Sequence, residues 1–315
     1  MALKTELCDL LDIEKPIIQG GMAWVATGEL AAAVSTAGGL GVIGAGSAPA
    51  DVIEKEIEKV RELTDKPFGL NIMLLSPFAE DIIDLAVEKE VPVITTGAGN
   101  PGKYVKRFQE IGSKVIPVVP SVALAKRMAR LNVDAVIAEG TEAGGHVGEL
   151  TTMALVPQVA DAVDIPVIAA GGVGDGRGLA AVLALGASGV QIGTRFVCSE
   201  ECTASLEFKK AIVGARDRDA VVTGRSTGHP VRNLKNKLTK EMDKLERQGV
   251  DPKKIEEIGS GKLRDAVIDG DVKEGSVMAG QISGMISEIK SVKEIIEEIL
   301  LKAEETIKSN YNLLN

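Results

Sequence analysis

Two stretches, residues 165–173 (IPVIAAGGV) and 190–196 (VQIGTRF), decide which fold this sequence encodes. Each is an apolar run that ends abruptly in glycine, as a buried parallel strand does when it meets a tight loop. Glycine lets backbone N–H groups close around an anion where a side chain would block its approach. Loops of this kind follow the seventh and eighth strands of (β/α)8 barrels. The two stretches therefore predict a barrel with a phosphate cup at the glycines that end them.

Apolar runs recur about every twenty to twenty-five residues, which is the spacing expected of βα units. Segments with helical periodicity separate them, for example 50–63, 78–89 and 179–185. Eight such runs favour a closed α/β TIM barrel, a (β/α)8 fold, over an open doubly wound sheet. The predicted strands lie at 16–21, 40–46, 68–75, 91–97, 114–119, 135–139, 166–171 and 189–194.

The βα rhythm stops after the eighth unit, which divides the chain into three parts. Residues 1–204 form the predicted barrel, whereas 205–270 are polar, charged and irregular, as in a smaller inserted or lid segment. The alternative for this segment is a solvated helical extension without a role. Residues 271–315 return to the barrel, and their pattern predicts a long amphipathic helix over 276–307. That helix completes the outer ring of the barrel or supplies a dimer interface.

Composition excludes several classes of protein. The 315 residues are 45% apolar, enough for one large core, but no apolar run is long enough to span a bilayer. The amino-terminal residues lack the basic and apolar regions of a signal peptide, so we expect a cytoplasmic protein. A net charge of −9 argues against nucleic acid as a partner. The cysteines Cys8, Cys198 and Cys202 lack metal-ligand spacing, and we expect no metal site.

Positive charge is concentrated in one segment of this acidic chain. Between Glu207 and Arg247 there are eleven Lys or Arg residues against six Asp or Glu residues, a net charge of +5, whereas the remaining residues carry −14. Such a segment can attract an acidic partner.

Residues 39–44 (GLGVIG) match the dinucleotide-binding pattern GxGxxG by letter. The pattern carries that meaning only where the glycines follow a strand and open a helix. Here they follow a helical segment, 29–37, and lead into a strand. The context argues against a Rossmann fold.

The chain contains only two histidines. His146 lies in a glycine-rich loop, 139–148, directly after the sixth predicted strand, and this is the catalytic end of a barrel. An imidazole there can act as a general acid or a hydrogen-bond donor near neutral pH. His229 lies in the basic segment, where a structural role is equally plausible.

Small and polar residues end several other strands, where a flat ring can lie against backbone and its edge can bind amide or carboxylate groups such as Asn71 and Glu139. No lysine ends a strand, which excludes a Schiff-base aldolase, and no cluster of carboxylates and histidines indicates a metal hydrolase. A phosphate cup, a polar pocket and one histidine leave the chemistry to a cofactor, and the cup fits the phosphate of FMN.

Several motifs resemble those of the nitronate monooxygenase and FMN-dependent enoyl-acyl-carrier-protein reductase II family. They are 19–24 (QGGMAW), 37–41 (AGGLG), 71–73 (NIM), 142–146 (EAGGH), 170–172 (AGG) and 191–196 (QIGTRF). Three further motifs resemble the reductase branch, and these are 74–78 (LLSPF), 95–101 (TTGAGNP) and 275–281 (GSVMAGQ).

The resemblance implies an FMN-containing barrel whose reaction is the last step of fatty-acid elongation. Reduced nicotinamide, NADH or NADPH, gives hydride to FMN, and FMN gives it to the β-carbon of a trans-2-enoyl thioester. The residues that the resemblance implies for the phosphate are Gly171, Gly172, Gly193 and Thr194, in the cup. The other implied flavin-binding residues are Gly21, Met22, Ala23, Asn71, Thr96, Glu139, Gly145, Met278 and Gln281.

Three hypotheses follow for the reductase. His146 protonates the α-carbon or polarises the thioester carbonyl. An acidic enoyl-acyl-carrier protein docks near Arg232, Lys235 and Lys237. The chain forms a homodimer, as the family makes plausible.

Two other functions remain open at this stage. A nitronate monooxygenase would use the same flavin and histidine, but nitronate and oxygen would turn over its FMN. A non-redox isomerase of phosphorylated metabolites would use the phosphate cup alone and would purify without colour.

Overall fold

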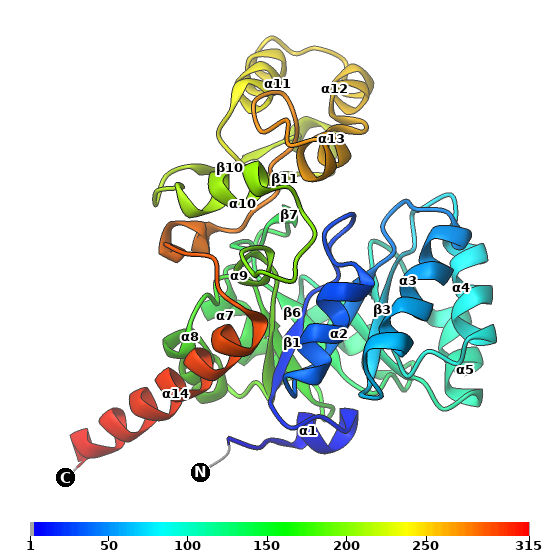
Figure 1. Cartoon of the computed structure of the whole chain (residues 1–315), viewed down its shortest axis with the longest axis vertical. Helices are drawn as coiled ribbons and strands as arrows, with labels where there is room; N and C mark the ends of the chain where they lie inside the picture. The colour runs from blue at the N-terminus through cyan, green and yellow to red at the C-terminus, as the bar shows by residue number, and fades with distance from the viewer. Residues whose placement is uncertain (1–2, 315) are drawn as a thin grey trace.

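The computed structural model describes residues 3–314 and forms a closed barrel with a segment standing above one end (Figure 1). Residues 1, 2 and 315, the outermost residues of the predicted barrel and C-terminal segment, lie outside the described range. The barrel strands are β1 Ile17–Gln19, β2 Gly41–Gly44, β3 Phe68–Met73, β4 Val93–Gly97, β5 Lys114–Val119, β6 Val136–Glu139, β8 Val167–Ala170 and β9 Gly189–Ile192. All eight coincide with predicted strands, and the predicted (β/α)8 fold class is confirmed.

The eight strands are parallel neighbours in the order β1-β9-β8-β6-β5-β4-β3-β2. A parallel bridge between Ile18 and Leu40 joins the two ends of this order and closes the sheet. The helices that surround or precede the strands are α1 Glu6–Leu11, α2 Gly28–Thr36, α3 Ala50–Leu63, α4 Ala79–Glu88, α5 Gly102–Glu110, α6 Val122–Ala129, α7 Thr152–Ala160, α8 Gly176–Ala184 and α9 Thr194–Val197.

Residues 39–44 do not open a helix. They follow α2 and run into β2, so the prediction that this GxGxxG match is not a dinucleotide fingerprint is confirmed.

Alternation along each strand produces two buried layers. One side packs against the outer helices, while the other fills the barrel interior with the side chains of Ile18, Val42, Val93, Ile116, Ile137 and Ile168. Leu7 and Leu11 of α1 belong to the interior cluster, and Figure 1 shows α1 beneath the amino-terminal ends of the strands. Each buried Ile or Val contributes about 2 kcal/mol. Because α1 covers one end of the interior, the opposite end is the one available for a site.

Residues 205–270, whose sequence pattern is irregular, fold into short helices and strands. They contain α10 Leu206–Val213, β10 Ala220–Thr223, η1 Arg225–Thr227, β11 Val231–Leu234, α11 Lys237–Arg247, α12 Pro252–Gly259 and α13 Lys262–Ile268. The segment is polar because its short helices each bury only a narrow face and expose the rest to solvent. Figure 1 shows this inserted segment on the side of the barrel opposite α1.

The inserted segment joins the barrel through a second sheet. Its strands pair antiparallel in the order β10-β11-β7, where β7 is Gly145–His146. The loop after β6 therefore contributes a strand to the sheet of the inserted segment.

The predicted helix over 276–307 is wrong in its first half. Residues 276–291 run extended apart from η2 Gln281–Met285, and α14 spans Val292–Tyr311, followed by η3 Asn312–Leu314. The backbone of Val277 accepts a hydrogen bond from Leu234 N–H at 2.9 Å, which holds this stretch against β11 instead of in a helix. Ser291 and Glu294 form a capping box that fixes the start of α14.

Helix α14 packs on α8, where the carbonyl of Ile299 lies so close to Gly176 that a Cβ atom would not fit. The outer-ring packing predicted for the C-terminal helix is therefore confirmed where α14 meets α8, around Ile299 and Ala303. No helix among residues 3–314 is long and apolar enough to cross a membrane.

Candidate functional site

The open end of the barrel presents a polar layer. Alternation along the strands turns the side chains of four polar residues toward the barrel interior. They are Asn71, Thr95, Glu139 and Gln191, each at the inward-facing position that follows the apolar ones. Strand pairing sets Asn71 beside Thr95, and Ala170 beside both Glu139 and Gln191. These polar groups therefore share one level at the carboxyl ends of the strands, which is the catalytic end of barrels.

Asn71 and Thr95 form one side of this mouth. Asn71 Nδ2 lies 2.8 Å from Thr95 Oγ1, and the backbone of Gly21 approaches the Asn71 side chain so closely that a Cβ atom would collide with it. Thr95 and Thr96 are both buried, and alternation along β4 turns Thr96, the expected flavin ligand, toward the helices. Thr95 is the threonine on the inward side, where it lies buried behind Asn71.

The predicted phosphate cup is assembled by strand pairing. Since Ala170 pairs with Gln191, the glycine loops that follow the two strands are neighbours. Within residues 3–314, the backbone N–H groups of Gly171, Gly172, Gly193 and Thr194 donate no hydrogen bond to protein. Gly171 and Gly172 have φ values of +82° and +72°, the left-handed region that favours glycine. The arrangement fits an anion such as a phosphate.

The residues expected around the flavin come together at the same end. Met22 Sδ would lie 3.2 Å from a Cβ atom on Gly193, and Met278 Sδ would lie 3.6 Å from one on Gly145. Ala23 lies against Gly46 beyond β2. Gly280 N–H donates to Thr194 Oγ1 at 2.9 Å. This hydrogen bond brings the C-terminal segment, residues 271–315, to the cup.

The loop that carries His146 is fixed from three sides. Glu142 accepts hydrogen bonds from the backbone N–H of Thr152, at the start of α7, at 3.0 Å for each carboxylate oxygen. Its own carbonyl accepts one from Gln281 N–H at 2.9 Å. The Thr152 hydroxyl lies 3.0 Å from Glu142 Oε2 and 2.9 Å from the carbonyl oxygen of Gly171, so the histidine loop and the cup share this threonine.

Arg232 supplies the third attachment and is not a surface residue. Its side chain is 6% exposed, and its Nη2 and Nε donate to the carbonyl oxygen of Thr141 at 2.9 and 3.2 Å. Burial lowers the pKa of its guanidinium, and the nearby Glu142 carboxylate opposes that shift. The expectation that Arg232 helps to dock a partner is wrong, because its guanidinium is buried and donates its hydrogen bonds to Thr141 within the protein. Lys235 and Lys237 do lie on the surface.

His146 is held at the edge of the mouth by β11, where it pairs with Val231. Although the residue is exposed overall, partial burial of its imidazole lowers its pKa, and the neighbouring His229 lowers it further. The ring is therefore neutral near pH 7 and retains one N–H donor.

Glu139 is the carboxyl group of the mouth and has no compensating charge. It is partly buried, and desolvation raises its pKa to about 7. A protonated carboxyl at this position can donate a hydrogen bond to the edge of a bound ring.

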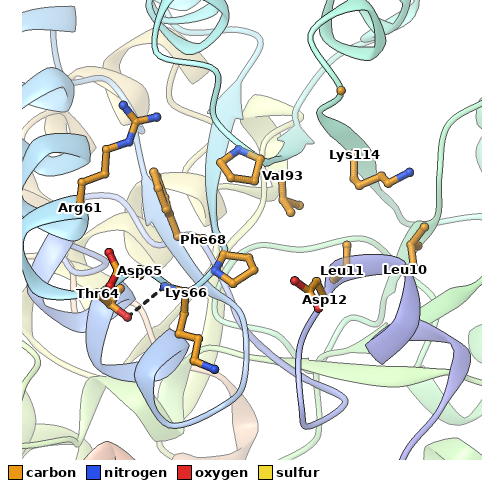
Figure 2. Close-up of a pocket in the computed structure, with 13 residues that line it drawn as sticks. Leu10, Leu11, Asp12, Arg61, Thr64, Asp65, Lys66, Phe68, Val93 and Lys114 are labelled. Atoms are coloured by element: carbon orange, nitrogen blue, oxygen red, sulfur yellow. Dashed lines mark hydrogen bonds between the residues drawn. The ribbon is translucent and has the colours of Figure 1, made fainter.

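Other features are less suited to chemistry. Figure 2 shows a cavity of about 640 Å³ lined by Phe68, Val93 and Lys114 at the starts of their strands, at the barrel end away from the cup. Burial raises the pKa of Cys198 to about 12, so its thiol is not a nucleophile. Among the residues that the structure describes, no three His, Cys, Asp or Glu side chains are placed to hold a metal ion.

Sequence reasoning missed four contributors to the site: Thr95, Glu142, Thr152 and Arg232. The alternation of Val93 with Thr95 could have identified Thr95 as the inward residue. A threonine at the start of a helix with a glutamate ten residues earlier is a weak signal, and the role of Arg232 depends on a strand pairing that no local pattern shows.

We predict that Gly171→Ala destabilises the protein and weakens FMN binding by about tenfold or more, because a Cβ atom there would meet the carbonyl oxygen of Gly140 at 2.7 Å. Gly112→Ala is the matched control, since Gly112 has nearly the same φ, +83°, and open space around it. The control should cost about 1 to 2 kcal/mol from backbone strain alone. Urea denaturation and flavin titration measure both effects, and equal losses in the two variants would contradict a crowded cup.

A second prediction concerns stability against pH. The folded-state pKa of Glu139, about 7, lies above its unfolded value, so the native state holds the proton that the unfolded state releases. The stability of ligand-free protein should fall as pH rises from about 4.5 to 7 and level off above that range. Glu139→Gln should remove this dependence and stabilise the protein at pH 8 by about 1 to 3 kcal/mol. Denaturation at pH 5 and pH 8 tests the sign, and unchanged pH dependence in the variant would refute it.

Comparison with known proteins agrees with this geometry. The family model for nitronate monooxygenase matches residues 4–90 and 81–302. The structure of FabK from Thermotoga maritima is 51% identical and covers 99% of each chain with a TM-score of 0.96. A nitroalkane oxidase from Streptomyces ansochromogenes is 29% identical, covering 97% of this chain and 99% of its own, with a TM-score of 0.84. A probable nitronate monooxygenase of Staphylococcus saprophyticus is 36% identical over 97% of this chain and 99% of its own. The chain belongs to the nitronate monooxygenase family.

Proposed function

We propose that this protein is an FMN-dependent oxidoreductase that uses NADH or NADPH to reduce trans-2-enoyl-acyl-carrier-protein thioesters. The observation that carries the proposal is the 51% identity to FabK of Thermotoga maritima across 99% of both chains. The motifs at 74–78, 95–101 and 275–281, which resemble the reductase branch, support it independently of the overall identity.

The residues at the barrel mouth fit FMN. The unpaired N–H groups of the cup suit its phosphate, and Asn71 and Glu139 suit the edge of its ring. Bound FMN would supply the redox chemistry, by accepting hydride from reduced nicotinamide and passing hydride to the β-carbon of the substrate. The proposed flavin-binding residues are Gly21, Met22, Ala23, Asn71, Thr95, Glu139, Gly145, Gly171, Gly172, Gly193, Thr194, Met278 and Gln281.

His146 is the proposed catalytic residue. Reduction must end with a proton on the α-carbon, and negative charge develops on the thioester carbonyl before that proton arrives. Because the pKa of His146 is lowered, its imidazole is neutral at pH 7. The ring can donate an N–H hydrogen bond, but it does not carry the extra proton of an imidazolium. We therefore assign it to polarisation of the carbonyl oxygen, with the proton drawn from solvent.

Two further parts of the proposal concern assembly. The inserted segment, 205–270, is proposed as the substrate segment because it holds the histidine loop through β7 and β11. A homodimer is proposed because α14 carries exposed Leu301, Ile307 and Tyr311.

Nitronate oxidation is the second candidate function. The relatives from Staphylococcus saprophyticus and Streptomyces ansochromogenes favour it, and it needs the same flavin and histidine. The non-redox isomerase is not retained, because the family is FMN-dependent.

The test of the proposed function follows the flavin spectrum without oxygen. NADH or NADPH should bleach the band near roughly 450 nm, and crotonyl thioester should restore it. His146→Ala should slow the second phase by about 100-fold at equal flavin content, and His146→Gln, which keeps an N–H donor, should slow it less. A band that returns only with nitronate or oxygen would favour the monooxygenase, and a normal second phase in His146→Ala would refute the role of the histidine.

A further prediction concerns the two histidines. Because the charge of His229 opposes protonation of His146, His229→Gln should raise the pKa of His146. The imidazole resonances of the protein, followed by NMR through a pH titration, measure this shift. An unchanged or lower pKa of His146 would show that the two rings do not interact.

A further inference from the structure

A groove of about 680 Å³ lies on the inserted segment, outside the barrel mouth. It runs between the end of α10, the strand β11, the start of α11 and the return at residues 272–277. Neither the flavin site nor the histidine loop contributes a residue to it.

The rim of the groove is strongly cationic. It carries one carboxylate, Asp219, and five cations: Arg216, Lys235, Lys237, Lys240 and Lys273. All five cationic residues are exposed. Arg216 pairs with Asp219 and Lys237 pairs with Glu274. The other three, Lys235, Lys240 and Lys273, have no ion pair among the described residues, and the Lys235 ammonium donates to the carbonyl oxygen of Arg218. The groove therefore presents uncompensated positive charge to solvent.

The floor of the groove is apolar. Leu234 and Val277 lie at its base, joined by a backbone hydrogen bond of 2.9 Å, and Ala211 and Val272 extend it. An apolar floor within a cationic rim complements an amphipathic surface with acidic side chains around apolar ones. A small inorganic anion would gain no favourable contact from the apolar floor.

The groove connects directly to the histidine loop. Strand β11 begins beside His146, with which Val231 pairs, and ends at Leu234 in the floor of the groove. Asn233 bridges to Met278, whose sulfur lies next to Gly145. Three residues of strand span roughly 10 Å, a distance that a flexible thioester arm can cover.

We propose that this groove docks the acidic carrier protein that delivers the enoyl thioester. The inference rests on the proposed function and names the surface that the partner uses. Lys244, one turn beyond Lys240 on α11, is exposed and extends the positive charge past the groove, whereas Arg247 is paired with Asp243. Both lie within the segment whose net charge is +5 in a chain that is otherwise −14. A field of that extent matches a protein surface better than a single nucleotide.

The experiment compares crotonyl-acyl-carrier-protein with crotonyl-CoA on the flavin-loaded enzyme. The test variant is Lys240→Glu with Lys273→Glu. The control is Lys253→Glu with Lys254→Glu, an equal change of charge at exposed positions of α12 outside the groove. The test variant should raise the KM for the carrier-bound substrate about tenfold and weaken its salt dependence. Its kcat, its KM for crotonyl-CoA and its KM for the nicotinamide should stay at the wild-type values.

Direct binding of the carrier protein to the same enzymes, measured by calorimetry, gives a readout independent of turnover. Loss of carrier binding in the test variant alone supports the docking surface. Equal losses on both thioesters, equal effects in the control, or a raised KM for nicotinamide alone would overturn it. A wild-type enzyme that reduces neither thioester would instead refute the proposed function.

Discussion

The site depends on the hydrogen bonds between Glu142 and the first residue of α7. A carboxylate at a helix amino terminus satisfies N–H groups that lack partners within the helix and interacts favourably with the helix dipole. Here it also fixes a glycine-rich loop that could not hold one shape alone, because its glycines carry a large conformational entropy. Thr152 extends the same contact to Gly171. Thr152 therefore links the cup to the histidine loop.

Three distant parts of the chain converge on two consecutive residues, Thr141 and Glu142. The barrel contributes Thr152, the inserted segment contributes Arg232, and the C-terminal segment contributes Gln281. A buried arginine is costly to desolvate, so two hydrogen bonds to one carbonyl are needed to offset that cost. Its presence indicates that the position of the loop is maintained at the expense of some stability.

The barrel could be predicted from the sequence because its signals are local and repeated. Each strand is an apolar run, and the glycines that end the last two strands identify the cup. The failures involve contacts between distant residues. The stretch at 276–291 has helical periodicity, but pairing with β11 outweighs that preference, and β7 is too short to leave any pattern. Arg232 looks like a surface cation until the pairing of its neighbours with the histidine loop shows where its side chain must go.

The two residues of β7 have β11 as their only strand partner within 3–314, and β11 is synthesised long after the barrel strand that precedes β7. On the ribosome the eight barrel strands emerge before the inserted segment can pair with the histidine loop. All eight barrel strands are therefore synthesised before the strand that pairs with His146. The placement of His146 and the completion of the main core both wait for the second half of the chain, because that core includes Leu234 of β11 and Ile299 of α14.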